Sequence, residues 1–196
     1  MNRSRLISLA VLFFALVVLS GCLSTAVVVT TTTAASAVIT DNRNYSVMLD
    51  DRDLTFRIQA ALSHDEQLSN SSAHLSVAVF NRIVLLVGQV PNEKLKLRAE
   101  SLAKSSSRIR LFYNDITVEE AISKVARTND SWITAKVKTV LATVSGIKSS
   151  SIKVVTEAGT VYLMGLIAPA QAELAASKVQ TVAGVKKIVK LFEYFN

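Results

Sequence analysis

Residues 84–90 read Val-Leu-Leu-Val-Gly-Gln-Val, and residues 161–167 read Val-Tyr-Leu-Met-Gly-Leu-Ile. Each stretch is an apolar run typical of a β-strand, with one glycine at the same place, followed by a proline (Pro91 or Pro169) and a helix-like segment. Recurrence of such a pattern within one chain indicates an internal repeat. The fold is therefore decided by a unit that the chain uses twice.

The repeat extends on both sides of these stretches. An apolar stripe upstream recurs at an offset of 79, the two glycines recur at 77, and the apolar residues downstream recur at 76. The matched positions are Leu54, Ile58 and Leu62 with Ile133, Val137 and Leu141; Gly88 with Gly165; and Ile109 and Phe112 with Val185 and Ile188. Small drifts of the offset indicate changes of loop length, so the chain is a tandem duplication of a module of about 65 residues.

Each module has the element order α-β-β-α-β. Apolar residues at i, i+4 and i+8 predict the first helix, alternating residues predict a strand with one buried face, and a turn leads into a second strand. A capped helix and a third strand follow. The predicted segments are a helix from near Asp53, strands at 75–79, 83–90 and 109–118, and a helix capped by Asn92 in module one; in module two they are a helix capped by Asp130 or Ser131, strands at 152–156, 160–167 and 185–195, and a helix from Pro169.

The predicted fold class is α+β, with two tandem modules at residues 51–118 and 130–196 and a linker at 119–129. Each module is expected to form a three-stranded mixed sheet with both helices on one face. A domain of about 60 residues buries only about 60% of its unfolded surface, so the two modules are expected to support one another. We interpret Gly88 and Gly165 as structural glycines, where a helix packs against bare backbone or a strand bulges.

The first 21 residues have the features of a signal peptide. Arg3 and Arg5 precede an apolar run from Leu6 to Leu19, and the segment ends in Leu-Ser-Gly-Cys22, which is similar to the bacterial lipobox. Proteins with this motif are acylated on the cysteine, and Cys22 is the only cysteine of the chain. The alternative is an uncleaved anchor helix that continues through Val29. Residues 22–50 are then expected to form a lipidated tether. By resemblance to such lipoproteins, Leu23 at the next position favours sorting to the outer membrane, facing the periplasm.

Catalytic chemistry has little support in this sequence. The two histidines, His64 and His74, are not spaced as metal ligands, and His64 lies in an expected polar loop after a helix. We therefore expect no enzymatic activity, no metal and no cofactor. The net charge of +7 suggests an acidic partner, either a membrane or a nucleic acid, but a nucleic acid conflicts with the export signal.

Trp132 is the informative difference between the modules, because its counterpart in module one is Asp53. On a helical wheel it lies about 125° from the centre of the buried stripe, on the side of Lys136 and Thr139. An indole close to lysines suits a membrane interface, where lysine meets anionic headgroups. The alternative is that Trp132 packs against module one as interdomain core.

The charge distribution agrees with a membrane surface in module two. Residues 130–196 carry eight basic and four acidic side chains, against eight and six in residues 53–118. The predicted phospholipid-binding residues, taken with Trp132 and Thr139, are Lys136, Lys138, Lys148 and Lys153. A solvated basic face is the simpler interpretation of the individual lysines.

Four segments carry a resemblance to a known family. They are VLLVGQVPN at 84–92, NDSWITAKV at 129–137, IKSSSIKVVTEAGTVYLMGLI at 147–167 and GVKKIV at 184–189. With the lipobox, they resemble the outer-membrane lipoproteins that have two BON domains. Module one departs from this pattern, because Arg108 stands where the family usually has a glycine.

This resemblance implies a non-enzymatic protein that binds anionic phospholipid, phosphatidylglycerol or cardiolipin, through its second BON domain. It also implies recruitment to the division site in cell division and support of envelope integrity. The competing hypothesis is a periplasmic scaffold that binds envelope proteins, such as outer-membrane assembly or peptidoglycan-remodelling factors.

Overall fold

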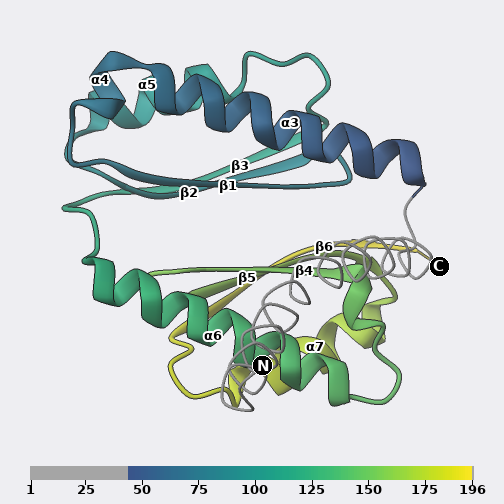
Figure 1. Cartoon of the computed structure of the whole chain (residues 1–196). Coiled ribbons are helices and arrows are strands. Elements are labelled where there is room, and N and C mark those ends of the chain that lie inside the picture. Colours follow the sequence, from purple (N-terminus) through teal and green to yellow (C-terminus); the bar gives the residue numbers. More distant parts are fainter. Residues whose placement is uncertain (1–43, 196) are drawn as a thin grey trace, which may run out of the picture. The chain divides into compact units, whose positions relative to one another are not determined.

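The computed structural model describes residues 44–195, which belong to one compact unit. Each module contains two main helices and a three-stranded sheet, as the sequence predicts (Figure 1). Module one comprises α3 (Tyr45–His64), α4 (Glu66–Ser69), β1 (His74–Phe80), β2 (Ile83–Val90), α5 (Glu93–Ala103) and β3 (Leu111–Val118). Module two comprises α6 (Lys124–Thr143), the 3-10 turn η1 (Ser149–Ser151), β4 (Ile152–Glu157), β5 (Thr160–Ile167), α7 (Pro169–Gln180) and β6 (Lys187–Tyr194).

Both sheets are mixed and have the same strand order. The hairpin strands β1 and β2 are antiparallel, and β3 pairs with β2 in parallel; β4, β5 and β6 repeat this arrangement. Each hairpin turns on two residues with positive φ, Asn81 and Arg82 in module one and Ala158 and Gly159 in module two. Such turns match the right-handed twist of the flanking strands.

Each module has a core between its helices and one face of its sheet. The α3 stripe of Leu54, Ile58 and Leu62 packs with the α5 residues Leu95 and Ala99 over the sheet of module one. The repeat places the equivalent core in module two, with Ile133, Val137 and Leu141 of α6 over β4 and β5. The small residues Ala172 and Ala175 let α7 approach its sheet closely.

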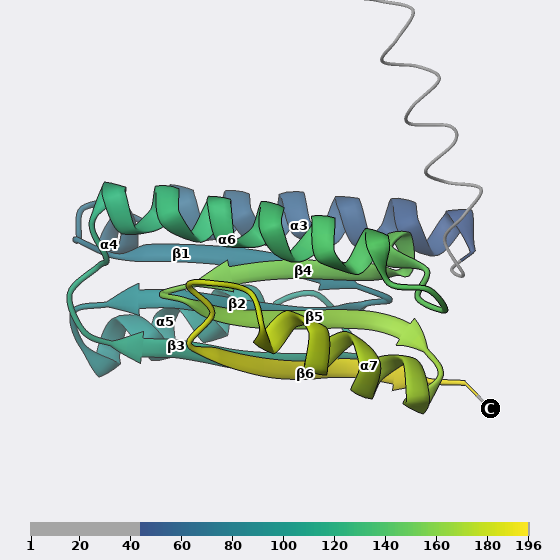
Figure 2. The ribbon, with the colours of Figure 1, turned by 90° about the horizontal axis from the view of Figure 1, so that it is seen from below.

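The other faces of the two sheets form a third core between the modules. Phe80, Leu85 and Val87 of module one are buried in the same cluster as Tyr162 and Met164 of module two. As a result all eight residues of β2 are buried. The expectation of mutual support is confirmed, whereas the expectation of one buried face for β1 is incomplete, since Ala78 and Phe80 are buried on the second face. Figure 2 shows α3 and α6 along the same edge of the paired sheets as β1 and β4.

Two helices begin earlier in the chain than the sequence predicts. Helix α3 begins at Tyr45 with Asn44 as its cap, so residues 45–50 are helical and do not belong to the tether. Helix α6 begins at Lys124, capped by the Ser123 hydroxyl, and takes up half of the expected linker. The polar loop expected after His64 contains the single-turn helix α4, capped by Asp65.

The two structural glycines lie against backbone at the start of the neighbouring hairpin strand, His74 in β1 and Ser151 just before β4, rather than against a main helix. A Cβ on Gly88 would collide with the carbonyl oxygen of His74, and Gly88 has a φ of 128°, which side chains rarely adopt. A Cβ on Gly165 would lie 2.7 Å from the carbonyl oxygen of Ser151. The interpretation as helix packing sites is therefore corrected: both glycines allow the start of the hairpin's first strand to approach the second.

Candidate functional site

Helix α6 holds Trp132 away from the protein core. Its buried residues, Asp130, Ile133, Val137 and Leu141, fix the helix on the sheet. Trp132 lies outside this stripe and is 67% exposed. The interpretation of Trp132 as interdomain core is therefore wrong, and the indole is available to an external partner.

The exposed surface of α6 carries only basic ionisable groups. Asp130 is the only acidic residue in α6, and it is 6% exposed. Lys124, Lys136 and Lys138 are exposed, and Arg127 is half-buried. The aromatic side chain is thus presented on a positively charged helix.

Lys136 and Thr139 share the side of α6 on which Trp132 lies, because they follow it at i+4 and i+7. Lys136 Nζ donates a hydrogen bond of 2.6 Å to the carbonyl oxygen of Ala183, in the turn after α7. The Thr139 hydroxyl donates to the Ala135 carbonyl at 3.0 Å. The structure therefore brings three of the predicted residues together on one face, which we call the Trp132 face: Trp132, Lys136 and Thr139.

The other predicted lysines lie elsewhere. Lys138 lines a separate groove of about 320 Å³ with Leu141 and Ile152, and exposed Lys148 immediately precedes the η1 residues of that groove. Lys153 is half-buried and donates from Nζ to the carbonyl oxygen of Val79 in module one, at 3.0 Å. Lys153 thus belongs to the contact between the modules, and its assignment to a lipid-binding surface is corrected.

Module one closes the corresponding face with ion pairs. Asp53 occupies the position of Trp132, and Arg108 occupies the position of Gly184. The Arg108 guanidinium donates to Asp53 and also lies 3.4 Å from Asp50, while Arg57 lies 3.0 Å from Asp53. The Arg108 hydrogen bond, followed by that of Arg57, holds the pKa of Asp53 below its usual value. The two modules therefore differ on this face, which carries a closed charge network in module one and an exposed indole in module two.

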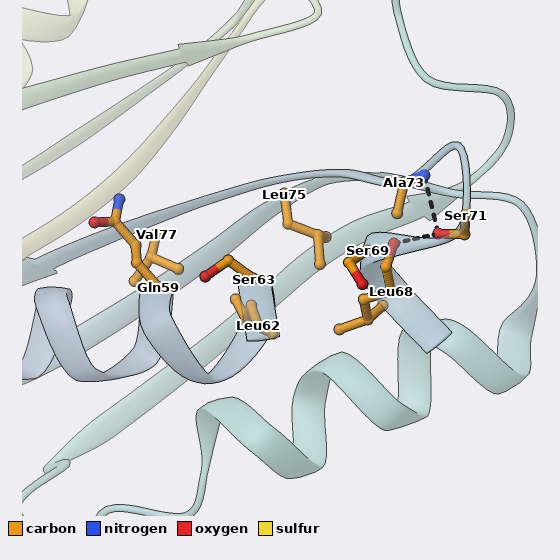
Figure 3. Close-up of a pocket in the computed structure, with 9 residues that line it drawn as sticks. All are labelled: Gln59, Leu62, Ser63, Leu68, Ser69, Ser71, Ala73, Leu75 and Val77. Atoms are coloured by element: carbon orange, nitrogen blue, oxygen red, sulfur yellow. Dashed lines mark hydrogen bonds between the residues drawn. The ribbon is translucent and has the colours of Figure 1, made fainter. Parts of the chain in front are cut away.

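A groove in module one offers no acid–base or metal chemistry. It has a volume of about 310 Å³ between α3, α4 and β1, and its lining consists of aliphatic, hydroxyl and amide side chains (Figure 3). Ser71 bridges its end, since its hydroxyl donates to the Leu68 carbonyl at 2.7 Å and accepts from the Ala73 amide at 3.1 Å. Across residues 44–195, no three His, Cys, Asp or Glu side chains converge as metal ligands.

Sequence reasoning missed a polar cluster buried between the modules. Gln89, 1% exposed, donates from Nε2 to Glu157 Oε1 at 3.1 Å, and Arg127 donates to Nδ1 of His74 at 3.2 Å. His74 Nε2 lies 3.7 Å from Glu157. The one available signal was Gln89 itself, a single polar residue in an otherwise apolar strand.

The His74–Glu157 contact is not an ion pair at neutral pH. Burial raises the pKa of Glu157, and burial, followed by the charge of Arg127, lowers the pKa of His74. Both pKa shifts favour the neutral forms, and 3.7 Å is too long for a hydrogen bond, so this contact links the modules less strongly than the Gln89–Glu157 hydrogen bond does. A second link between the modules is the Tyr162 hydroxyl, which donates to Asp115 at 2.6 Å.

The membrane attachment expected from the sequence lies outside the described residues. Cys22 and the apolar leader both fall there. Between residues 44 and 195, no helix is long and apolar enough to cross a membrane.

Comparison with known proteins places the repeat in a family. The BON domain model matches residues 50–120 and 129–194. The chain is 35% identical over 196 residues to the outer membrane lipoprotein DolP of Haemophilus influenzae, covering all of both chains. It is 37% identical to the 21 kDa hemolysin of Actinobacillus pleuropneumoniae, covering 79% of each.

Among solved structures, the C-terminal domain of CdsD, a structural protein of the type III secretion system of Chlamydia trachomatis, is 12% identical, with a TM-score of 0.31 over 74% of this chain and 98% of that one. The two domain matches and the full-length likeness establish the family. The chain belongs to the BON domain family, as a dual-BON outer membrane lipoprotein of the DolP type.

Proposed function

We propose that this protein is anchored to the outer membrane by an acylated Cys22, faces the periplasm and binds anionic phospholipid through BON domain 2. The observation that carries this proposal is the exposure of Trp132, 67%, on a helix whose only acidic side chain is buried. The ligand class is phosphatidylglycerol or cardiolipin, whose headgroups carry the negative charge that the lysines require.

Charge and apolar contact have to act together in this site. A lysine near an anionic membrane contributes about 1 kcal/mol, so Lys136, the lysine of the Trp132 face, supplies only weak binding on its own. Insertion of the Trp132 indole adds burial of a large aromatic surface, with its polar N–H left at the wet interface. The acyl anchor would raise the local concentration of lipid, so a weak site becomes sufficient.

The biological role that we propose is non-enzymatic. A membrane anchor and a lipid-binding domain on one chain recruit the protein to regions rich in anionic lipid, such as the division site, where it supports envelope integrity.

Vesicle binding tests the proposal. The mature chain with Cys22→Ser, which lacks the anchor, is mixed with vesicles of phosphatidylcholine alone or with phosphatidylglycerol added. We expect a blue shift of Trp132 emission, since it is the only tryptophan, with the anionic vesicles at low salt, and loss of the shift at high salt. No shift with either vesicle, or equal shifts with both, would contradict the proposal.

A further inference from the structure

Module two contains a second open site, on the far side of α7 from the Trp132 face. A groove of about 410 Å³ lies between α7 and β6, and we call it the α7–β6 groove. Its apolar lining comes from Ala176, Val185 and Ile188, and its basic lining comes from Lys186, Lys187 and Lys190. The combination of apolar surface with three lysines indicates an amphipathic, negatively charged ligand.

Module one fills the equivalent space with its own side chains. At an offset of 76, Ala176, Gln180, Ile188 and Lys190 correspond to Glu100, Lys104, Phe112 and Asn114. Glu100 accepts hydrogen bonds from Lys104 and from Asn114, the latter at 2.7 Å, and the Lys104 ammonium lies 5.0 Å from the centre of the Phe112 ring. Ala176, Gln180 and Ile188 of module two are smaller than their counterparts or uncharged, and Lys190 pairs with Glu173, so the groove is specific to module two.

One wall of the α7–β6 groove is a free strand edge. The sheet order is β4-β5-β6, so β6 pairs with β5 on one side only. The backbone N–H and C=O groups on its other side can pair with an added strand. Side chains alternate across such a strand, which places Ile188 and Lys190 on the same face as the helices.

The lysines of the groove exceed the acidic groups that could neutralise them. Lys190 pairs with Glu173 at 2.7 Å, and the Glu173 side chain is 69% exposed, so this pair is easily exchanged for another carboxylate. Within the described part of the chain, neither Lys186 nor Lys187 lies within ion-pairing distance of a carboxylate. The groove therefore retains positive charge beside the free edge.

We propose that the α7–β6 groove is a docking site for an acidic, extended segment of a partner protein. The segment adds to the edge of β6 and directs carboxylates at alternate positions toward Lys186 and Lys190. The aliphatic stems of these acidic side chains lie over Ile188, which shares that face of the strand, and the residues between them point to the opposite face. Backbone pairing supplies affinity, and the lysines select for acidic sequences. This inference is independent of lipid binding by the Trp132 face.

Peptide titration followed by NMR tests this proposal. The ¹⁵N-labelled mature chain with Cys22→Ser is titrated with a synthetic octapeptide, Glu-Val-Glu-Thr-Glu-Val-Glu-Thr, and with the same peptide carrying lysine in place of glutamate. We expect saturable shifts of the β6 and Lys186 amides with the acidic peptide only, and none along β3.

Two double variants with the same change of charge distinguish binding in the α7–β6 groove from nonspecific attraction of the acidic peptide to a basic protein. Lys186→Glu combined with Lys187→Glu should weaken binding of the acidic peptide about tenfold or more. Lys94→Glu combined with Lys96→Glu, the same charge change on α5 of module one, should leave binding unchanged, and urea unfolding checks that all variants fold.

Three results would overturn the proposal. They are the absence of saturable shifts, an equal loss of binding in both double variants, and equal shifts of the same amides by glycerophosphoglycerol, which would identify a phosphate site instead. In the first case the lysines serve only to protect the free edge from aggregation.

Discussion

Asp130 of α6 accepts a hydrogen bond of 2.9 Å from the backbone amide of Gly159, at the tip of the β4–β5 hairpin. Its second oxygen accepts from the amide of Ala158, also at 2.9 Å. Module one repeats the arrangement, since Asp51 accepts from Asn81 and Arg82 at 2.7 Å each. In both modules a buried carboxylate on the first helix therefore satisfies the two amides of a tight turn.

Replacement of Asp130 should strongly destabilise module two. Asp130→Ala leaves two turn amides without their charged acceptor, and each such loss typically costs about 1–3 kcal/mol, so we expect a decrease of about 2–6 kcal/mol in the free energy of unfolding. Urea denaturation measures it. Exposed Asn129→Ala is the control and should change stability by less than about 0.5 kcal/mol. A decrease of the same size in both variants would show that the carboxylate has no special role.

Side chains at the two strand glycines should destabilise the fold to different degrees. Gly88→Ala combines a collision with His74 and a φ of 128°, whereas Gly165→Ala faces only the Ser151 carbonyl at 2.7 Å. We expect Gly88→Ala to be the worse variant, with Gly165→Ala in the range of about 1–3 kcal/mol. Gly146→Ala, which has a φ of 83° and open space around it, isolates backbone strain. Thermal melts that rank Gly146→Ala as the most damaging would contradict the steric explanation.

The sequence predicted which helices and strands form, but it did not predict where the helices α3 and α6 begin. The apolar stripes of α3 and α6 begin at Leu54 and Ile133, but both helices start earlier, in turns whose residues contribute little to the core. Tyr45 and Leu49 in the first turns of α3 are exposed, so hydrophobic periodicity could not reveal them. Asp130 was interpreted as a cap because it precedes the stripe, whereas it lies inside the helix and binds the turn.

The sequence indicated that the modules support one another, but it could not identify the residues that make the contact. An uninterrupted apolar strand such as β2 indicates burial on both faces, but it does not say what covers the second face. Lys153 shows the consequence for the site, because its ammonium group binds the Val79 carbonyl of the other module, which only the packed sheets bring near. Trp132 could be placed correctly because helical geometry alone sets its angle from the core.

The buried Glu157 should make stability depend on pH. Burial raises the pKa of Glu157 in the folded state, so the folded protein binds a proton at this carboxyl more readily than the unfolded chain does. Proton binding therefore stabilises the fold. This stabilisation is greatest below the ordinary carboxyl pKa of 4.5 and is lost as pH rises through the folded pKa. Glu157→Gln keeps an acceptor for Gln89 and removes the cost of a buried charge. We therefore expect the variant to be more stable than the wild type at pH 7.5, with the difference shrinking toward pH 4.5.

Urea unfolding at several pH values measures this difference directly. Comparison of the two proteins at each pH removes the separate effect of His74, whose lowered pKa costs stability below about pH 6.5 in both. A contrary result would be a Glu157→Gln variant that is less stable than the wild type by the same amount at pH 7.5 and at pH 4.5. It would show that His74 or Arg127 holds the carboxylate in its charged form.

Cys22 should be required for attachment to the membrane. Cys22→Ser removes the only thiol that can be acylated, so the precursor should remain unprocessed or the mature chain should leave the outer membrane. Metabolic labelling with palmitate and fractionation of the envelope measure both effects. Label on the serine variant would rule out acylation at this position.

Replacement of Trp132 separates binding from folding. Trp132→Glu introduces a charge at a 67% exposed position, so stability should change by less than about 0.5 kcal/mol, while vesicle binding should be lost because indole insertion is replaced by repulsion from anionic headgroups. Phe56→Glu is the matched control, since Phe56 is an aromatic residue 71% exposed on α3 of module one. Flotation with anionic vesicles and urea unfolding are measured on both variants.

Flotation and urea unfolding of the two variants together distinguish three outcomes. Lost binding in Trp132→Glu with retained binding in Phe56→Glu places the lipid contact on α6. Equal losses in both would mean that added negative charge anywhere weakens binding, and the Trp132 face would have no special role. Retained binding in Trp132→Glu would leave the basic residues, Lys124, Lys136 and Lys138, as the main contact, and the indole would then have to serve a different partner.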